Sequence, residues 1–89
     1  MKELKDTTEF MNSSEYKDRF VAEYYQTKIR YNKLHKMVIK YEAGTLDFEP
    51  KCSLELLTQQ ASYMGQYLKC LELRAEIEDI NLEKYENYE

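Results

Sequence analysis

Glycine and proline are scarce in this sequence, with two glycines and one proline among 89 residues. Tight turns and β-bulges depend on these residue types, whereas the abundant Glu, Lys, Leu, Gln and Met favour helix. Long apolar runs are also missing: no stretch approaches the ~20 residues of a membrane span, and the segment after Met1 lacks the apolar core of a signal peptide. We therefore expect an all-α protein that resides in the cytoplasm.

Residues suited to metal binding and catalysis are few. His35 is the single histidine, and Cys52 and Cys70 show no metal-type spacing with it, so we interpret both as reduced, structural thiols. Glycine-rich phosphate loops, nucleophile elbows and dinucleotide fingerprints are missing. We expect no enzyme, no metal and no cofactor. The net charge of −4 also argues against binding to duplex nucleic acid. Membrane binding is not expected either, because the sequence lacks the large apolar face that it requires.

The chain divides by pattern into one helical domain, residues 1–89, built on a helical hairpin. A short N-terminal segment (1–11) precedes a helix over 14–43, a turn over 44–52, a second helix over 53–84 and a frayed acidic tail over 85–89. Asn12 or Ser14 caps the first helix, Gly44 ends it and Ser53 caps the second. Apolar residues recur in steps of three and four along two seams: Phe20, Tyr24, Thr27, Tyr31, Leu34, Val38 and Tyr41; Leu54, Leu57, Ala61, Met64, Leu68, Leu71 and Ala75.

Further apolar side chains lie off these seams, and two helices alone cannot bury them. We therefore expect a homo-oligomer, the alternative being a monomer whose N-terminal segment folds back as a third helix. The off-seam residues are Ile29, Met37, Ile39, Leu56, Leu73, Ile77 and Ile80.

Basic and acidic residues are unevenly distributed. Residues 15–40 carry seven basic against three acidic side chains, and residues 71–89 carry seven acidic against two basic ones. In a straight hairpin the acidic tail lies beside Lys17 and Arg19 and does not reach residues 28–40. A cationic, tyrosine-rich patch then stays uncompensated, which suits a phosphate-bearing aromatic ligand, although a solvated surface is an equally good interpretation. Its candidate residues are Tyr24, Tyr25, Lys28, Arg30, Lys33, Lys36, Lys40, Tyr63 and Tyr67.

Gly65 stands inside the second predicted helix, where glycine costs about 1 kcal/mol relative to alanine. Its position, four residues after Ala61, indicates that something approaches the backbone closely. Another packed helix and a ligand lying over the gap are the two alternatives.

The stretch between Tyr16 and Leu82 contains a set of motifs: Tyr16-Lys-Asp-Arg-Phe20, Glu23-Tyr24, Lys28-Ile29-Arg30, Lys33-Leu34, Phe48, Leu57, Gln60, Met64, Tyr67-Leu68, Leu71 and Arg74. This set resembles the anti-CBASS sponge proteins of phages. The resemblance implies a short helix and two long antiparallel helices that assemble into hexamers. It also implies that cyclic oligonucleotide immune signals are sequestered in pockets between protomers without being cleaved. Phosphate-facing cations would come from the lysines and arginine of the patch, and a stacking ring from one of its tyrosines.

Two functions therefore stand as hypotheses. The first is a phage sponge that binds cyclic nucleotides in an infected bacterial host and so inhibits anti-phage defence. The second is a non-catalytic helical interaction module that docks on a host protein through its acidic C-terminal face.

Overall fold

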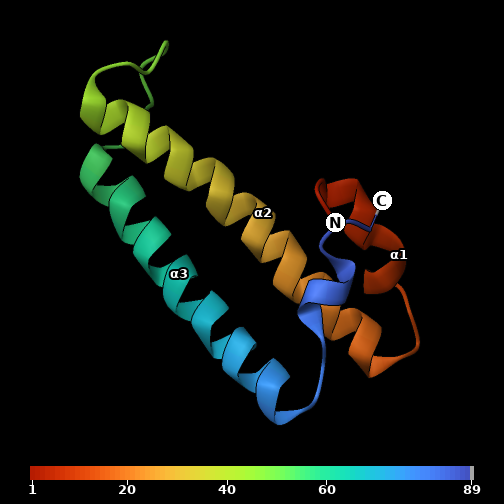
Figure 1. Ribbon diagram of the computed structural model, residues 1–89. Coiled ribbons are helices and arrows are strands. Elements are labelled where there is room, and N and C mark those ends of the chain that lie inside the picture. Colours follow the sequence, from red (N-terminus) through yellow and green to blue (C-terminus); the bar gives the residue numbers. More distant parts are fainter. Residues whose placement is uncertain (89) are drawn as a thin grey trace.

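Helices form every regular element in the described part of the chain, residues 1–88 of the computed structural model. The 3-10 helix η1 (Leu4–Thr7) continues into the short helix α1 (Thr8–Met11). The long helices α2 (Tyr16–Ala43) and α3 (Leu54–Ile77) run antiparallel, and a second 3-10 helix, η2 (Leu82–Tyr85), follows (Figure 1). The all-α fold with a long helical hairpin, predicted from the sequence, is confirmed.

The two predicted seams face each other between α2 and α3. Leu71 is completely buried, and Phe20 and Leu68 are only 2 and 4% exposed. Every other seam residue is buried or half-buried. The three- and four-residue spacing therefore identified the correct face of each helix, because that spacing aligns side chains on one side of a 3.6-residue turn.

Local sequence sets two of the helix ends. Gly44 ends α2 with a left-handed φ of 77°, which a residue without a Cβ adopts freely, and Thr45 donates to the Lys40 carbonyl at 2.9 Å. The Ser53 hydroxyl caps α3 by accepting from the Leu56 amide at 3.1 Å. At the start of α2 the predicted caps, Asn12 or Ser14, were wrong, because the N-cap is Glu15 and no side chain caps the helix. The helix begins at Tyr16 rather than residue 14, and the Ser13 hydroxyl accepts from the Glu15 amide at 3.1 Å.

The second long helix was predicted to continue to residue 84, but α3 ends at Ile77. Asp79 has a φ of 58°, and the Ile80 amide donates to the Ala75 carbonyl at 2.8 Å, so the chain reverses at this point. The left-handed residue costs about 1–2 kcal/mol, whereas burying an isoleucine side chain contributes about 1.5–3 kcal/mol. Ile80 is only 8% exposed after the reversal, which explains why the chain leaves the helix.

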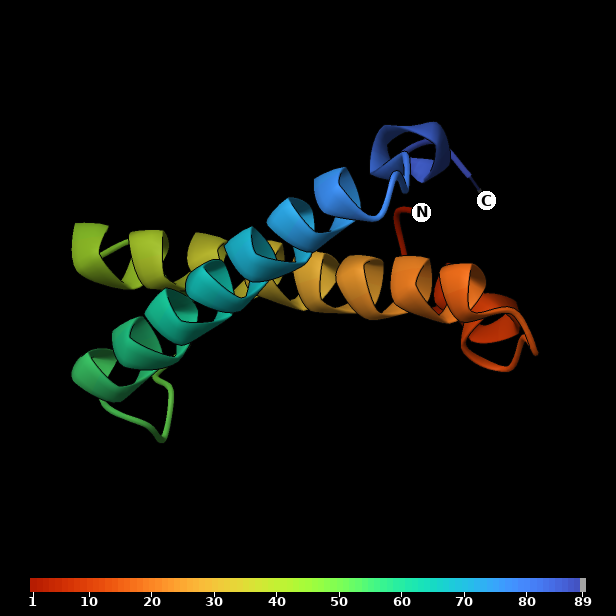
Figure 2. The ribbon, with the colours of Figure 1, turned by 90° about the horizontal axis from the view of Figure 1, so that it is seen from below.

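The core is concentrated at one end of the hairpin, which we call the head. Here residues 1–12 and 78–88 pack around the first half of α2, and the N-terminus lies beside the segment that follows α3 in both views (Figures 1 and 2). The Met1 nitrogen donates to the backbone carbonyls of Tyr85 and Glu86. Ile80 and Ile29, expected among the surplus apolar residues, are buried in this region.

The opposite end of the hairpin is less covered. Ile39, Phe48 and Leu56 are each about half exposed, at 51, 56 and 52%. On the outer side of α3, Leu73 is 54% and Ile77 83% exposed. Folding of the N-terminal segment onto α2 therefore covers only part of the apolar surface that the sequence predicted to be surplus.

Candidate functional site

A cleft of about 560 Å³ lies between α2 and the returning C-terminal segment. On the α2 side it is lined by residues spaced three to four apart, which places them on one helix face. The opposite wall is formed by the C-terminal segment with Leu82, Glu83 and Glu86. The α2 residues in the lining are Tyr24, Tyr25, Lys28, Ile29, Asn32, Lys33 and Lys36.

Lysine ammonium groups dominate the charge on the α2 wall. Lys28, Lys33 and Lys36 all line the cleft, and Lys2 joins them from the N-terminal segment. Lys33 and Lys36 are exposed and Lys28 is half-buried, so these side chains are accessible. Such a group of compact cations can hold an anion with two or more charges.

Two buried tyrosines form the floor of the cleft. Tyr24 and Tyr25 are each 7% exposed, and their rings meet edge to face with centroids 5.1 Å apart. The Tyr24 hydroxyl donates to Glu72 at 2.7 Å, and the Tyr25 hydroxyl donates to the Leu82 carbonyl at 2.6 Å. Burial raises the pKa of both phenols, as do the nearby carboxylates, so both stay neutral at physiological pH.

The positions of the Glu83 and Glu86 carboxylates differ from the charge distribution predicted from the sequence. The acidic tail was predicted not to reach residues 28–40, yet both glutamates line the same cleft as Lys28, Lys33 and Lys36. The prediction assumed a straight helix to residue 84, and the reversal at Asp79 instead carries the tail back across α2. The basic patch is therefore partly compensated within one chain.

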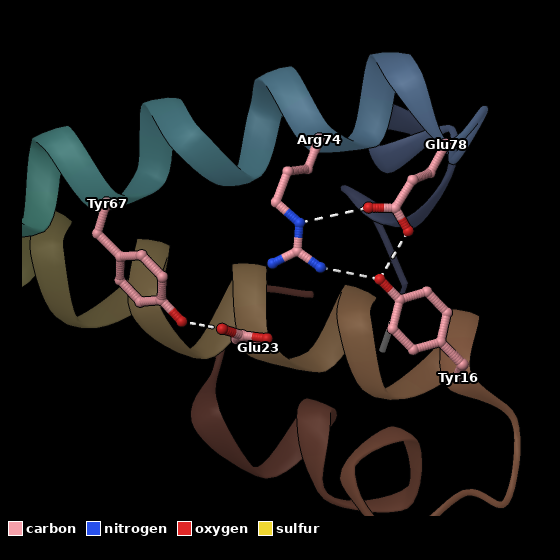
Figure 3. A network of polar contacts seen from close by, with 5 residues as sticks. All are labelled: Tyr16, Glu23, Tyr67, Arg74 and Glu78. Carbon is pink, nitrogen blue, oxygen red and sulfur yellow. Dashed lines mark hydrogen bonds and ion pairs between the residues drawn. The ribbon is translucent and has the colours of Figure 1, made fainter.

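Four predicted site residues lie outside this cleft. Arg30 is exposed and donates to the Gln26 side chain at 3.0 Å, and Lys40 lies exposed farther along α2. On α3, the exposed Tyr63 accepts from Gln59 at 3.2 Å, and the Tyr67 hydroxyl bonds to Glu23 (Figure 3). Within one chain, the structure thus brings together Tyr24, Tyr25, Lys28, Lys33 and Lys36 of the predicted set.

A second polar cluster was not predicted as a unit. The Tyr16 hydroxyl donates to Glu78 at 2.6 Å and accepts from Arg74 at 2.9 Å, while Arg74 and Glu78 are 3.3 Å apart (Figure 3). The Arg74 guanidinium also lies 5.0 Å from the Phe20 ring centre. This cluster fastens the end of α3 to the start of α2. The i, i+4 spacing of Arg74 and Glu78 was the one signal in the sequence that pointed to it.

Gly65 of α3 faces the Tyr31 side chain of α2 in the same chain. A Cβ at this position would lie 3.5 Å from the nearest atom of the Tyr31 ring on α2. The Tyr31 ring in turn stacks on His35, with centroids 5.8 Å apart. Of the two alternatives for Gly65, the neighbour is another packed helix, and it lies at an ordinary van der Waals distance.

Residues 1–88 contain neither a metal-ligand cluster nor a membrane-spanning helix. No group of three or more His, Cys, Asp or Glu side chains in this range could hold a metal ion. None of its helices is both long enough and apolar enough to cross a membrane. The sulfur atoms of Cys52 and Cys70 are free thiols at exposed positions.

The fold and the cleft define a small helical-hairpin protein whose α2 lines a cleft with lysines and two buried tyrosines. The model of the Sequestin family matches residues 14–77, and the chain belongs to this family. The family resemblance noted from the sequence is thereby confirmed, and the family name describes sequestration of a ligand. No curated protein and no solved structure gives a significant match.

Proposed function

We propose that this protein is a sponge that binds cyclic oligonucleotide immune signals and holds them without cleaving them, thereby inhibiting the anti-phage defence of a bacterial host. The observation that carries the proposal is the grouping of Lys28, Lys33 and Lys36 in one cleft above the tyrosine floor. Its volume of about 560 Å³ falls within the range of small-molecule sites. Membership of the Sequestin family supports ligand sequestration as the mode of action.

The chemistry of the cleft suits a ligand with at least two phosphates. The lysines can donate charge-assisted hydrogen bonds to phosphate oxygens, and the Asn32 amide, which also lines the cleft, can pair with a base edge. The buried phenol rings of Tyr24 and Tyr25 give a rigid apolar base under the ligand. In this account a stacking ring comes from a more exposed tyrosine, because neither floor ring has a free face.

Self-association supplies those rings in our proposal. Tyr63 and Tyr67 are 61 and 42% exposed on α3, and Leu73 and Ile77 leave apolar surface on the same helix. A second copy that covers this surface would bring its own tyrosines, and the Arg30 and Lys40 side chains, to a shared pocket. We propose a homo-oligomer, a hexamer as in the sponge proteins that the chain resembles. Light scattering at micromolar concentration tests this, and a monomer would contradict it.

The interaction-module hypothesis has less support. It requires an acidic C-terminal face that is free to meet a host protein. Glu83 and Glu86 instead line a cleft of their own chain, and Leu82 is held by the Tyr25 hydroxyl. We therefore retain the sponge as the proposed function.

Charge reversal at the cleft tests the proposed function. The double variant Lys33→Glu and Lys36→Glu should weaken binding of a cyclic nucleotide at least about 100-fold, because two charge-assisted contacts are lost and replaced by repulsion. The matched control, Lys51→Glu and Lys69→Glu, changes the net charge equally at exposed positions outside the cleft. Titration calorimetry gives the affinities and circular dichroism verifies the helicity. Equal affinity in the two double variants would remove Lys33 and Lys36 from the site.

A further inference from the structure

The C-terminal segment 81–88, which we call the latch, is attached to the head by hydrogen bonds and by aromatic contacts. The Met1 nitrogen donates to the carbonyls of Tyr85 and Glu86. The Leu82 carbonyl accepts from the Tyr25 hydroxyl at 2.6 Å. The Phe10 ring of α1 meets the rings of Tyr85 and Tyr88 edge to face, with centroids 5.6 and 5.0 Å away. The latch therefore occupies a defined position across α2, with its start at the chain reversal around Asp79.

In this position the latch presents two carboxylates to the cationic wall. Glu83 and Glu86 line the cleft opposite Lys28, Lys33 and Lys36. The side-chain ion pairs within residues 1–88 are Lys5 with Glu3 and Arg74 with Glu78, so Glu83 and Glu86 form no close ion pair with the three lysines. An anion placed in this cleft would therefore meet both the lysines and the two glutamate carboxylates.

We propose that the latch is an internal gate that competes with the anionic ligand for the lysines of the cleft. This inference rests on the proposed function, since it concerns regulation of the same site. A bound phosphate gains from the lysines but is repelled by Glu83 and Glu86, so the ligand-bound state has the latch swung away. The apparent affinity for the ligand is then the intrinsic affinity multiplied by the fraction of molecules in which the latch is open.

The latch is an addition to the part of the chain that defines the family. The family model ends at residue 77, and the latch and its anchor Phe10 both lie outside residues 14–77. Core packing explains Ile80, which is 8% exposed, but it does not explain the exposed Glu83, Glu86 and Tyr88. Substitutions at these three positions can therefore release the gate while the head remains folded.

Two variants separate gating from a general change in charge. The double variant Glu83→Gln and Glu86→Gln removes both carboxylates from the cleft. The control, Glu49→Gln with Glu55→Gln, has the same net charge but is changed at exposed positions outside the cleft. Tyr88→Ala breaks one aromatic contact with Phe10 and leaves the charge unchanged. The probes are inorganic pyrophosphate and a cyclic dinucleotide, each titrated into the full chain by calorimetry.

We expect the Glu83→Gln and Glu86→Gln variant to bind pyrophosphate about 10-fold more tightly than the wild type, and Tyr88→Ala about 3-fold more tightly, with the control unchanged. Unchanged or weaker binding in both latch variants, an equal gain in the control, or no pyrophosphate binding in any protein would overturn the gate. If pyrophosphate behaves as expected and no cyclic nucleotide binds, the gate stands and the sponge function fails. If the dinucleotide binds wild type and latch variants equally, the sponge stands and the gate fails.

Discussion

Replacing Gly65 by alanine should stabilise the protein, because the structure leaves room for the added methyl group. The new Cβ would lie 3.5, 3.7 and 3.8 Å from three atoms of the Tyr31 side chain, which are ordinary van der Waals distances. An interior helical Gly→Ala change contributes about 0.8–1.0 kcal/mol, and each new contact adds about 0.1–0.2 kcal/mol. We expect a gain of about 1 kcal/mol in the free energy of unfolding, or roughly 4–8 °C in Tm for a domain of this size.

Gly44→Ala is the matched control with the opposite sign. Gly44 has a φ of 77° and no atom within 4 Å of its would-be Cβ, so alanine meets the strain of the left-handed region without gaining a contact. We expect a loss of about 1–2 kcal/mol. Urea unfolding followed by circular dichroism at two protein concentrations measures both variants. A Gly65→Ala variant that is less stable than wild type would refute the reasoning, and would mean that another chain occupies the space above Gly65.

Two further predictions concern the head. Leu71→Ala should lower the free energy of unfolding by about 2–5 kcal/mol, because Leu71 is fully buried. Leu73→Ala, at a 54% exposed position, should lower it by less than half as much. Equal losses in urea unfolding would mean that the helix register is wrong. Burial and the hydrogen bond to Glu72 raise the pKa of Tyr24 above that of an unfolded tyrosine. The stabilisation that the neutral Tyr24 contributes is therefore complete below about pH 10 and is lost as the pH rises further. Wild type should lose stability more steeply than Tyr24→Phe above about pH 10. Parallel pH profiles of the two proteins would contradict this.

The hairpin was predictable because its determinants are local or periodic. The seams follow from residue spacing, the stop at Gly44 from its tolerance of positive φ, and the start of α3 from the Ser53 cap. Helical spacing also placed Lys33 and Lys36 on one line, and the structure puts both in the cleft.

The end of α3 and the closing of the cleft could not be predicted in the same way. Helical periodicity continues through Ile77 and Ile80, so the pattern gives no stop signal there. The reversal at Asp79 is decided by the burial of Ile80 against the head, which is a tertiary effect. Because the latch follows from that reversal, the position of Glu83 and Glu86 opposite the lysines was missed as well.

The sponge function makes one requirement that can be measured directly: tight, stoichiometric binding of a ligand that is released unchanged. Purified protein is screened by thermal shift against cyclic di- and trinucleotides and cyclic ADP-ribose isomers, and bound ligand is recovered by heat denaturation and identified by mass spectrometry. A ligand at 100 times its Kd stabilises the fold by about 2.7 kcal/mol, so a clear rise in Tm with one class and intact recovery of that compound are expected. No shift with any compound, or recovery of a cleaved product, would contradict the account.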